Sequence, residues 1–98
     1  MLTDAQIRHL CRVASWTNGY DINQHGTRIA TLRVLNRLGF IETRTVINRR
    51  REEVRREFVT AAGIVELRRL AMMATLDRRL SLYVRDVLAA LDKSAVKK

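Results

Sequence analysis

The segment from residue 27 to residue 67 constrains the fold most, because its pattern changes from helical to extended and back again. Apolar residues recur at helical spacing until Gly39, a residue type that often ends a helix in the left-handed conformation. Residues 40–47 then alternate and are rich in β-branched side chains, which predicts a strand. A second apolar run enters another helix at Thr60 and passes Gly63. The order helix, strand, charged segment, helix follows.

The charged segment itself, residues 48–58, fits either a helix or a hairpin. Several of its arginines and glutamates are spaced i,i+4, as in a charged helix, so propensity alone does not decide. A helix there would leave the strand at 40–47 without a partner, and isolated strands are not stable. We therefore predict a hairpin with a return strand ending at 58–59 and a tip at 48–53. Because the tip has no glycine, a longer, mobile loop is expected instead of a two-residue turn.

The N-terminal helix is signalled by Thr3, a candidate N-cap, and by Gln6, which completes a capping-box pattern. Its buried face is predicted to hold Ile7, Leu10, Cys11 and Ala14. Turn residues at 17–19 should end it. Residues 20–26 fit either a short helical turn around 22–25 or a loop.

The helix that ends before Gly39 has two distinct sides at 100° per residue. Leu32 and Leu35 should face the core, with Ile29 flanking them. The opposite side and its margins carry Thr27, Arg28, Ala30, Thr31, Arg33, Val34 and Arg37. A small, polar, arginine-bearing face suits entry into a DNA major groove. An ordinary amphipathic helix with solvated arginines explains the same pattern equally well.

The net charge of +9 is concentrated in part of the chain. Residues 1–26 are neutral, whereas residues 27–60 hold nine arginines against four glutamates. Arginine keeps its charge at any working pH and binds phosphates and guanine edges through two parallel hydrogen bonds. This balance favours a polyanionic partner. A solubilising surface is the alternative.

Two motifs together resemble a known domain. They are LNRLGFI at residues 35–41 and FVTAAGIVEL at residues 58–67, separated by the arginine-rich hairpin. In this order they resemble the winged helix-turn-helix domain, and are most similar to the MarR and PadR-like bacterial regulators. In those families a leucine-rich recognition helix is closed by glycine and a large apolar residue, and the wing leads into a Thr-x-x-Gly helix start. The resemblance covers about residues 3–67, although the family's second helix is not evident in residues 18–26.

The resemblance implies DNA contacts from two elements. In the recognition helix, residues 27–38, they would come from Thr27, Arg28, Thr31, Arg33 and Arg37. In the wing they would come from Arg44, Arg49, Arg50, Arg51 and Arg55.

Residues 68–98 are predicted to extend a long C-terminal helix in the same compact unit as the domain at 1–67, because neither proline nor glycine follows Gly63. Its apolar stripe includes Met73, Leu76, Leu80, Tyr83, Val84, Val87 and Leu91. We expect this stripe to form a homodimer interface that spaces two recognition helices one DNA turn, ~34 Å, apart. Alternatively, the helix breaks near 75–77 and folds back within the chain.

Taken together, the sequence predicts a mainly α, α+β protein and no enzyme. Neither a phosphate-binding loop nor a nucleophile elbow is present, and His9 and Cys11 lack metal-ligand spacing, so no cofactor is expected. The single cysteine and the lack of a signal-like or membrane-length apolar run favour the cytoplasm. The first hypothesis is a dimeric, sequence-specific binder of double-stranded DNA, most simply a prokaryotic or phage transcriptional repressor. The second is a winged-helix protein-interaction or nucleoprotein assembly factor with non-specific nucleic-acid affinity. The sequence does not indicate whether a small-molecule effector binds.

Overall fold

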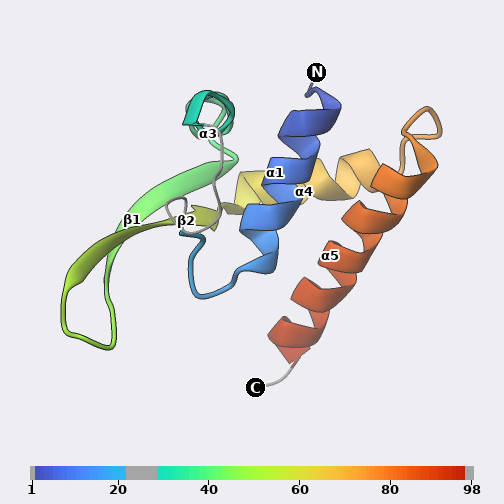
Figure 1. Cartoon of the computed structure of the whole chain (residues 1–98). Coiled ribbons are helices and arrows are strands. Elements are labelled where there is room, and N and C mark those ends of the chain that lie inside the picture. The colour runs from blue at the N-terminus through green and yellow to red at the C-terminus, as the bar shows by residue number, and fades with distance from the viewer. Residues whose placement is uncertain (1, 22–28, 97–98) are drawn as a thin grey trace.

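The computed structural model describes residues 2–21 and 29–96, whose arrangement is shown in Figure 1. The elements in chain order are α1 (Asp4–Ser15), α3 (Ile29–Arg37), β1 (Ile41–Ile47), β2 (Glu53–Val59), α4 (Ala61–Ala71) and α5 (Arg78–Val96). Four helices and one antiparallel hairpin in this part of the chain confirm the predicted α+β class. No helix within it is long and apolar enough to cross a membrane. The turn suggested around 22–25 and two predicted contact residues, Thr27 and Arg28, lie outside the described residues.

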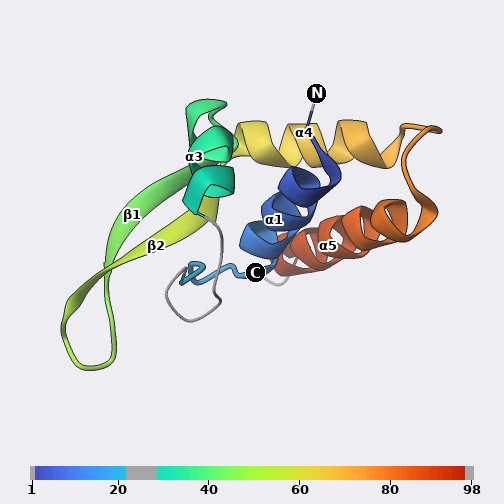
Figure 2. The same ribbon diagram turned by 45° about the horizontal axis from the view of Figure 1, so that its top comes forward.

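Helix α1 lies at the centre of the fold, between the hairpin and α5 (Figures 1 and 2). Thr3 caps it as predicted, because the Thr3 hydroxyl accepts a hydrogen bond from the Gln6 amide while the Gln6 side chain accepts one from the Thr3 amide. The four residues predicted for its buried face, Ile7, Leu10, Cys11 and Ala14, are all buried. Helices α3, α4 and α5 and strand β2 all contact α1, so its apolar side organises the core.

A side-chain hydrogen bond connects the turn after α3 to the start of α4. Gly39 has φ +79° and follows α3 as the predicted left-handed cap, with the Gly39 amide donating to Asn36 O and the Phe40 amide to Leu35 O. The Thr60 hydroxyl donates to Gly39 O and accepts from the Gly63 amide, which caps α4. A Cβ on Gly63 would lie 2.2 Å from Phe40 O, so only glycine fits there.

The hairpin confirms the predicted strands. Strands β1 and β2 pair in antiparallel register from Ile41 opposite Val59 to Ile47 opposite Glu53. Tyr20, fully buried, extends the sheet by one bridge, since it exchanges backbone hydrogen bonds with Glu57 at 2.8 and 3.0 Å. The distal half of the hairpin projects away from the helices (Figure 2).

The predicted long C-terminal helix is wrong, and the fold-back alternative is the one observed. Helix α4 ends at Ala71, and α5 begins at Arg78 and packs against α4 and α1. Asp77 favours this break, because its carboxylate accepts hydrogen bonds from the Arg79 and Leu80 amides and caps α5. The fold-back is also favoured because α5 covers an apolar side of α1 that would otherwise be exposed to water.

The residues predicted to meet a second copy therefore contribute to the core of their own chain. Leu80, Val84 and Val87 are buried in it. The other four, which pack against the same core and are half-buried, are Met73, Leu76, Tyr83 and Leu91. A stripe of this spacing does not reveal from sequence whether its cover comes from the same chain or from another.

Candidate nucleic-acid interface

Helix α3 separates apolar and basic residues onto two sides. Leu32 and Leu35 are buried against the core, as predicted. Arg33 and Arg37 are exposed, and Thr31 is half-buried at the margin. Ile29, predicted to flank the core, is instead 57% exposed at the first turn of α3. The basic side of this helix is thus free of the protein core.

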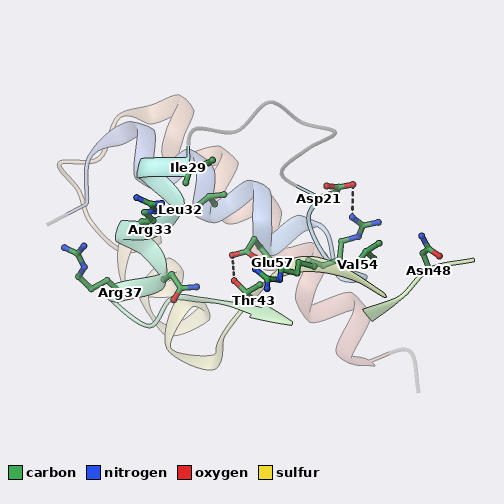
Figure 3. Close-up of a pocket in the computed structure, with 12 residues that line it drawn as sticks. Asp21, Ile29, Leu32, Arg33, Arg37, Thr43, Asn48, Val54 and Glu57 are labelled. Carbon is green, nitrogen blue, oxygen red and sulfur yellow. Dashed lines mark hydrogen bonds and ion pairs between the residues drawn. The ribbon is translucent and has the colours of Figure 1, made fainter. Parts of the chain in front are cut away.

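An open groove of ≈ 940 Å³ lies between α3 and the hairpin. Helix α3 contributes Ile29, Leu32, Arg33, Asn36 and Arg37 to its walls, and the hairpin contributes Thr43, Val54, Arg55, Arg56 and Glu57. Figure 3 shows Ile29 and Leu32 on the side of α3 toward this groove, with Glu57 and Thr43 at its base. The groove brings two elements that were predicted separately, the arginine-bearing helix and the hairpin, to opposite sides of one space.

Both carboxylates in the groove are engaged by neighbouring groups. Glu57 is only 8% exposed and accepts a hydrogen bond of 2.9 Å from the Thr43 hydroxyl. Asp21 forms an ion pair of 2.7 Å with Arg56, and both side chains are largely buried (Figure 3). Neither the buried glutamate nor this ion pair was predicted from the sequence, because residues 21 and 56 become neighbours only through the bridge between Tyr20 and β2.

The hairpin tip is organised by Asn48. The Asn48 carboxamide oxygen accepts hydrogen bonds of 2.9 Å from the amides of Arg50 and Glu52. The Asn48 backbone accepts from the Arg51 amide and donates to Glu52 O, both at 3.0 Å. The tip is longer than two residues, as predicted, and these four hydrogen bonds close it. Asparagine before a turn was the sequence signal for this role.

Three consecutive arginines, Arg49, Arg50 and Arg51, are exposed at this tip. Arg51 has φ +61° and is the only residue besides glycine with a positive φ in the described part of the chain. Glycine adopts a positive φ most easily, so an arginine at this position of the turn has a conformational cost.

Arg44 lies apart from the other predicted contact residues. Its guanidinium forms an ion pair with Glu42 and lies 4.8 Å from the centre of the Phe58 ring. Alternation along β1 puts Arg44 on the face opposite Thr43 and hence opposite the face that carries Glu57 and Arg55. The structure therefore separates Arg44 from Arg55; the cross-strand neighbour of Arg44 is Arg56, whose guanidinium is paired with Asp21.

The remaining arginines carry the positive charge of this surface. Within residues 2–21 and 29–96, no carboxylate lies within ion-pair distance of Arg33, Arg37, Arg49, Arg50, Arg51 or Arg55. The two carboxylates that line the groove, Asp21 and Glu57, are already engaged by neighbouring groups, so these six guanidinium groups are available to an anion outside the chain.

Comparisons of the chain with models of protein families, with curated protein sequences and with solved structures found no match. The function is therefore inferred from the residues of this chain.

Proposed function

We propose that this protein binds double-stranded DNA with sequence selectivity and acts as a small transcriptional regulator, most simply a repressor. The observation that carries the proposal is the placement of six arginines, without carboxylate partners among the described residues, on two elements that border one groove. Three of these arginines lie on the hairpin tip, which projects away from the helices (Figure 2). The tip can therefore reach a partner that extends beyond the protein, such as a DNA duplex.

Helix α3 would read sequence in the major groove. A helix with its side chains is about 10–12 Å across and fits the major groove, which is ~12 Å wide. Arg33 and Arg37, one turn apart on its exposed side, can reach guanine edges or phosphates. Two further candidates near the start of this helix, Thr27 and Arg28, belong to the same proposal.

The hairpin tip would bind the phosphate backbone or a narrow minor groove beside α3. Arg49, Arg50 and Arg51 would supply affinity and salt dependence more than sequence discrimination. The backbone of Arg51 supports this role, because a positive φ disfavours any residue except glycine and asparagine. An arginine at such a position has a conformational cost that an added phosphate contact can offset.

The order of the elements supports membership of the winged helix-turn-helix class. The hydrogen bonds of Thr60 to Gly39 and Gly63 hold the end of α3 at the junction of the hairpin and α4. The bridge from Tyr20 to Glu57 holds the segment after α1 against β2. In this class, that arrangement presents a recognition helix and a wing on one side of the domain.

A selection from random double-stranded sequences tests the proposal directly. We expect recovery of one motif, and loss of its selectivity in Arg33→Ala and Arg37→Ala variants that keep the wild-type circular dichroism spectrum. A folded wild-type protein that enriches no motif at any salt concentration would contradict sequence-selective binding. That result would instead favour a non-specific nucleic-acid or protein-binding role.

A further inference from the structure

The outer edge of strand β1 has no neighbouring strand among the described residues. The sheet consists of β1 and β2, and Tyr20 extends it at β2, on the side away from β1. In Figures 1 and 2, no described helix or strand runs beside the outer edge of the distal half of β1. This edge is therefore open to a partner.

The backbone of Thr43, Thr45 and Ile47 points toward the open edge. Glu57 exchanges both of its backbone hydrogen bonds with Tyr20, so its N–H and C=O point away from β1. Thr43 lies opposite Glu57, and two residues paired in this way in an antiparallel sheet both turn their N–H and C=O away from each other. Because the orientation repeats at every second residue, the same holds for Thr45 and Ile47. No described backbone group forms a hydrogen bond with these three residues on that side.

Strand β1 lacks the features that usually protect an edge strand. Exposed edges are commonly interrupted by proline, by lysine or by a bulge, or they are very short. Strand β1 is seven residues long, contains neither proline nor lysine, and pairs with β2 in one unbroken register. Its basic residue, Arg44, forms an ion pair with Glu42 of the same strand. The edge can therefore act as a template for a further strand.

The charges near this edge favour an acidic strand. Arg55 lies opposite Thr45 on one face of the sheet, and the small threonine leaves room for the arginine to reach across it toward the edge. Three exposed arginines, 49–51, follow β1 at the tip. None of these four arginines has a carboxylate within ion-pair distance among the described residues. The exposed glutamates at 52–53 reduce this positive charge but do not cancel it.

We propose that the outer edge of β1 binds an extended acidic segment of a partner protein as a third strand of the sheet. Backbone hydrogen bonds to Thr43, Thr45 and Ile47 hold the segment, while its acidic side chains meet Arg55 and the tip arginines. An apolar side chain of the segment can pack on Ile47, which is 71% exposed. A second copy of this chain is disfavoured at this edge, because two chains of net charge +9 repel each other.

A segment bound at this edge also competes with DNA. Its acidic groups occupy the tip arginines at 49–51, which the proposed function assigns to phosphates. Binding of the segment should therefore release the protein from a duplex. The competition rests on the proposed function, whereas binding of the segment does not.

Amide hydrogen exchange of the whole chain tests the strand addition. The probe is a short synthetic peptide of alternating glutamate and valine. We expect it to slow exchange of the Thr43, Thr45 and Ile47 amides about tenfold or more, because these amides gain hydrogen bonds when a strand is added. The amides of Arg44 and Val46 face β2 and should change less. Unchanged exchange at all three edge amides with millimolar peptide would overturn the proposal.

Thr45→Pro removes one edge amide without changing the charge. Proline is tolerated in an edge strand where its missing N–H would face solvent, and circular dichroism checks that the variant folds. We expect Thr45→Pro to bind the peptide about tenfold more weakly, and Thr45→Val, which keeps the amide, to bind like the wild type. Equal binding by a folded Thr45→Pro variant contradicts strand addition. If Thr45→Pro does not fold, the exchange measurement on the wild type decides.

Two further peptides separate strand pairing from charge. A lysine–valine peptide should bind much more weakly, and one that bound equally would rule out an acidic partner. A glutamate–proline peptide has the same negative charge but cannot pair as a strand, so it should leave the edge amides unchanged. If it binds as tightly as the glutamate–valine peptide, charge alone explains the binding and strand addition is wrong. If the edge amides of the free chain become protected as its concentration rises, a second copy is the occupant and the acidic partner is wrong.

Competition with the selected duplex separates this binding site from the proposed function. We expect the glutamate–valine peptide to displace DNA from the wild type but not from Thr45→Pro. If the peptide protects the edge amides but the protein binds no DNA, the proposed function fails and the edge site stands. If the protein binds DNA but the peptide leaves the edge amides unprotected, the edge site fails and the proposed function stands.

Discussion

The backbone carbonyl of Asn48 accepts a hydrogen bond of 3.0 Å from the amide of Arg51 and helps hold that arginine at φ +61°. This single turn both closes the hairpin tip and fixes where the third arginine of the tip points. Arg51 therefore has both a strained backbone conformation and a positive charge.

Stability and binding should separate at Arg51. Arg51→Gly removes both the guanidinium and the strained backbone, whereas Arg51→Ala removes only the guanidinium. We expect Arg51→Gly to be more stable than Arg51→Ala by about 1 kcal/mol, because only glycine adopts this φ freely. Both should bind DNA more weakly to the same extent, roughly tenfold, since each lacks one charged group. Denaturant unfolding and fluorescence anisotropy measure the two effects. Equal stability of the two variants would show that the turn is not strained.

The tip arginines should control the salt dependence of DNA binding. Replacing Arg49, Arg50 and Arg51 with alanine should weaken binding to every sequence and lower the slope of log K against log salt by up to about 2.7, at ~0.9 for each phosphate that is no longer neutralised. The matched control replaces three exposed arginines away from the groove, Arg8, Arg78 and Arg79, and so removes the same charge. If both triple variants lower the slope equally, net charge and not the tip is responsible.

Cys11 should make the protein sensitive to alkali. Burial raises the pKa of the Cys11 thiol from 9.0 to about 12. The unfolded chain therefore loses this proton first, so stability is fully present below pH 9 and decreases from there toward pH 12 by up to about 1.4 kcal/mol per pH unit. Cys11→Ala should decrease less steeply over this window. It should keep part of the slope, because burial also raises the pKa of Tyr83. Urea unfolding at several pH values tests this, and identical slopes in both proteins would contradict it.

Leu80 should stabilise the monomer and not an oligomer. Because Leu80 is 1% exposed within a single chain, Leu80→Ala is expected to lower the free energy of unfolding by about 2–5 kcal/mol. The decrease should be the same at low and high protein concentration, since Leu80 is already covered within its own chain. A decrease that grows with protein concentration would place Leu80 in an interface instead. Leu82→Ala, at an exposed site on the same helix, is the control.

Local signals in the sequence predicted much of the fold. The capping box at Thr3 and Gln6, the glycine cap at Gly39 and the alternation along β1 each depend on residues close together in the chain, so they can be recognised without the fold. The hairpin was also predictable, because a strand needs a partner and only the charged segment was available.

Features that depend on distant residues were not predictable. The apolar stripe of α5 has the same sequence pattern whether α1 or a second copy covers it. Helix α1, which covers it, lies more than sixty positions earlier in the chain. Arg44 and Arg55 look alike in sequence, but only Arg44 is engaged by a neighbouring carboxylate and a ring among the described residues. The burial of Glu57 follows from its bridge to Tyr20, 37 positions earlier.

Thr60 and Gly63 have a mechanical consequence for recognition. The Thr60 hydroxyl donates a hydrogen bond to Gly39, two residues after α3, and Thr60 also caps α4 directly after β2. Helix α3 and the hairpin therefore share one anchor and should move as a single rigid body. The angle between them is then set by the protein before any duplex arrives. Under the proposed function, a DNA site would have to bend, twist or narrow its grooves to match that angle, so sequences that deform easily should bind best even at base pairs that no side chain touches.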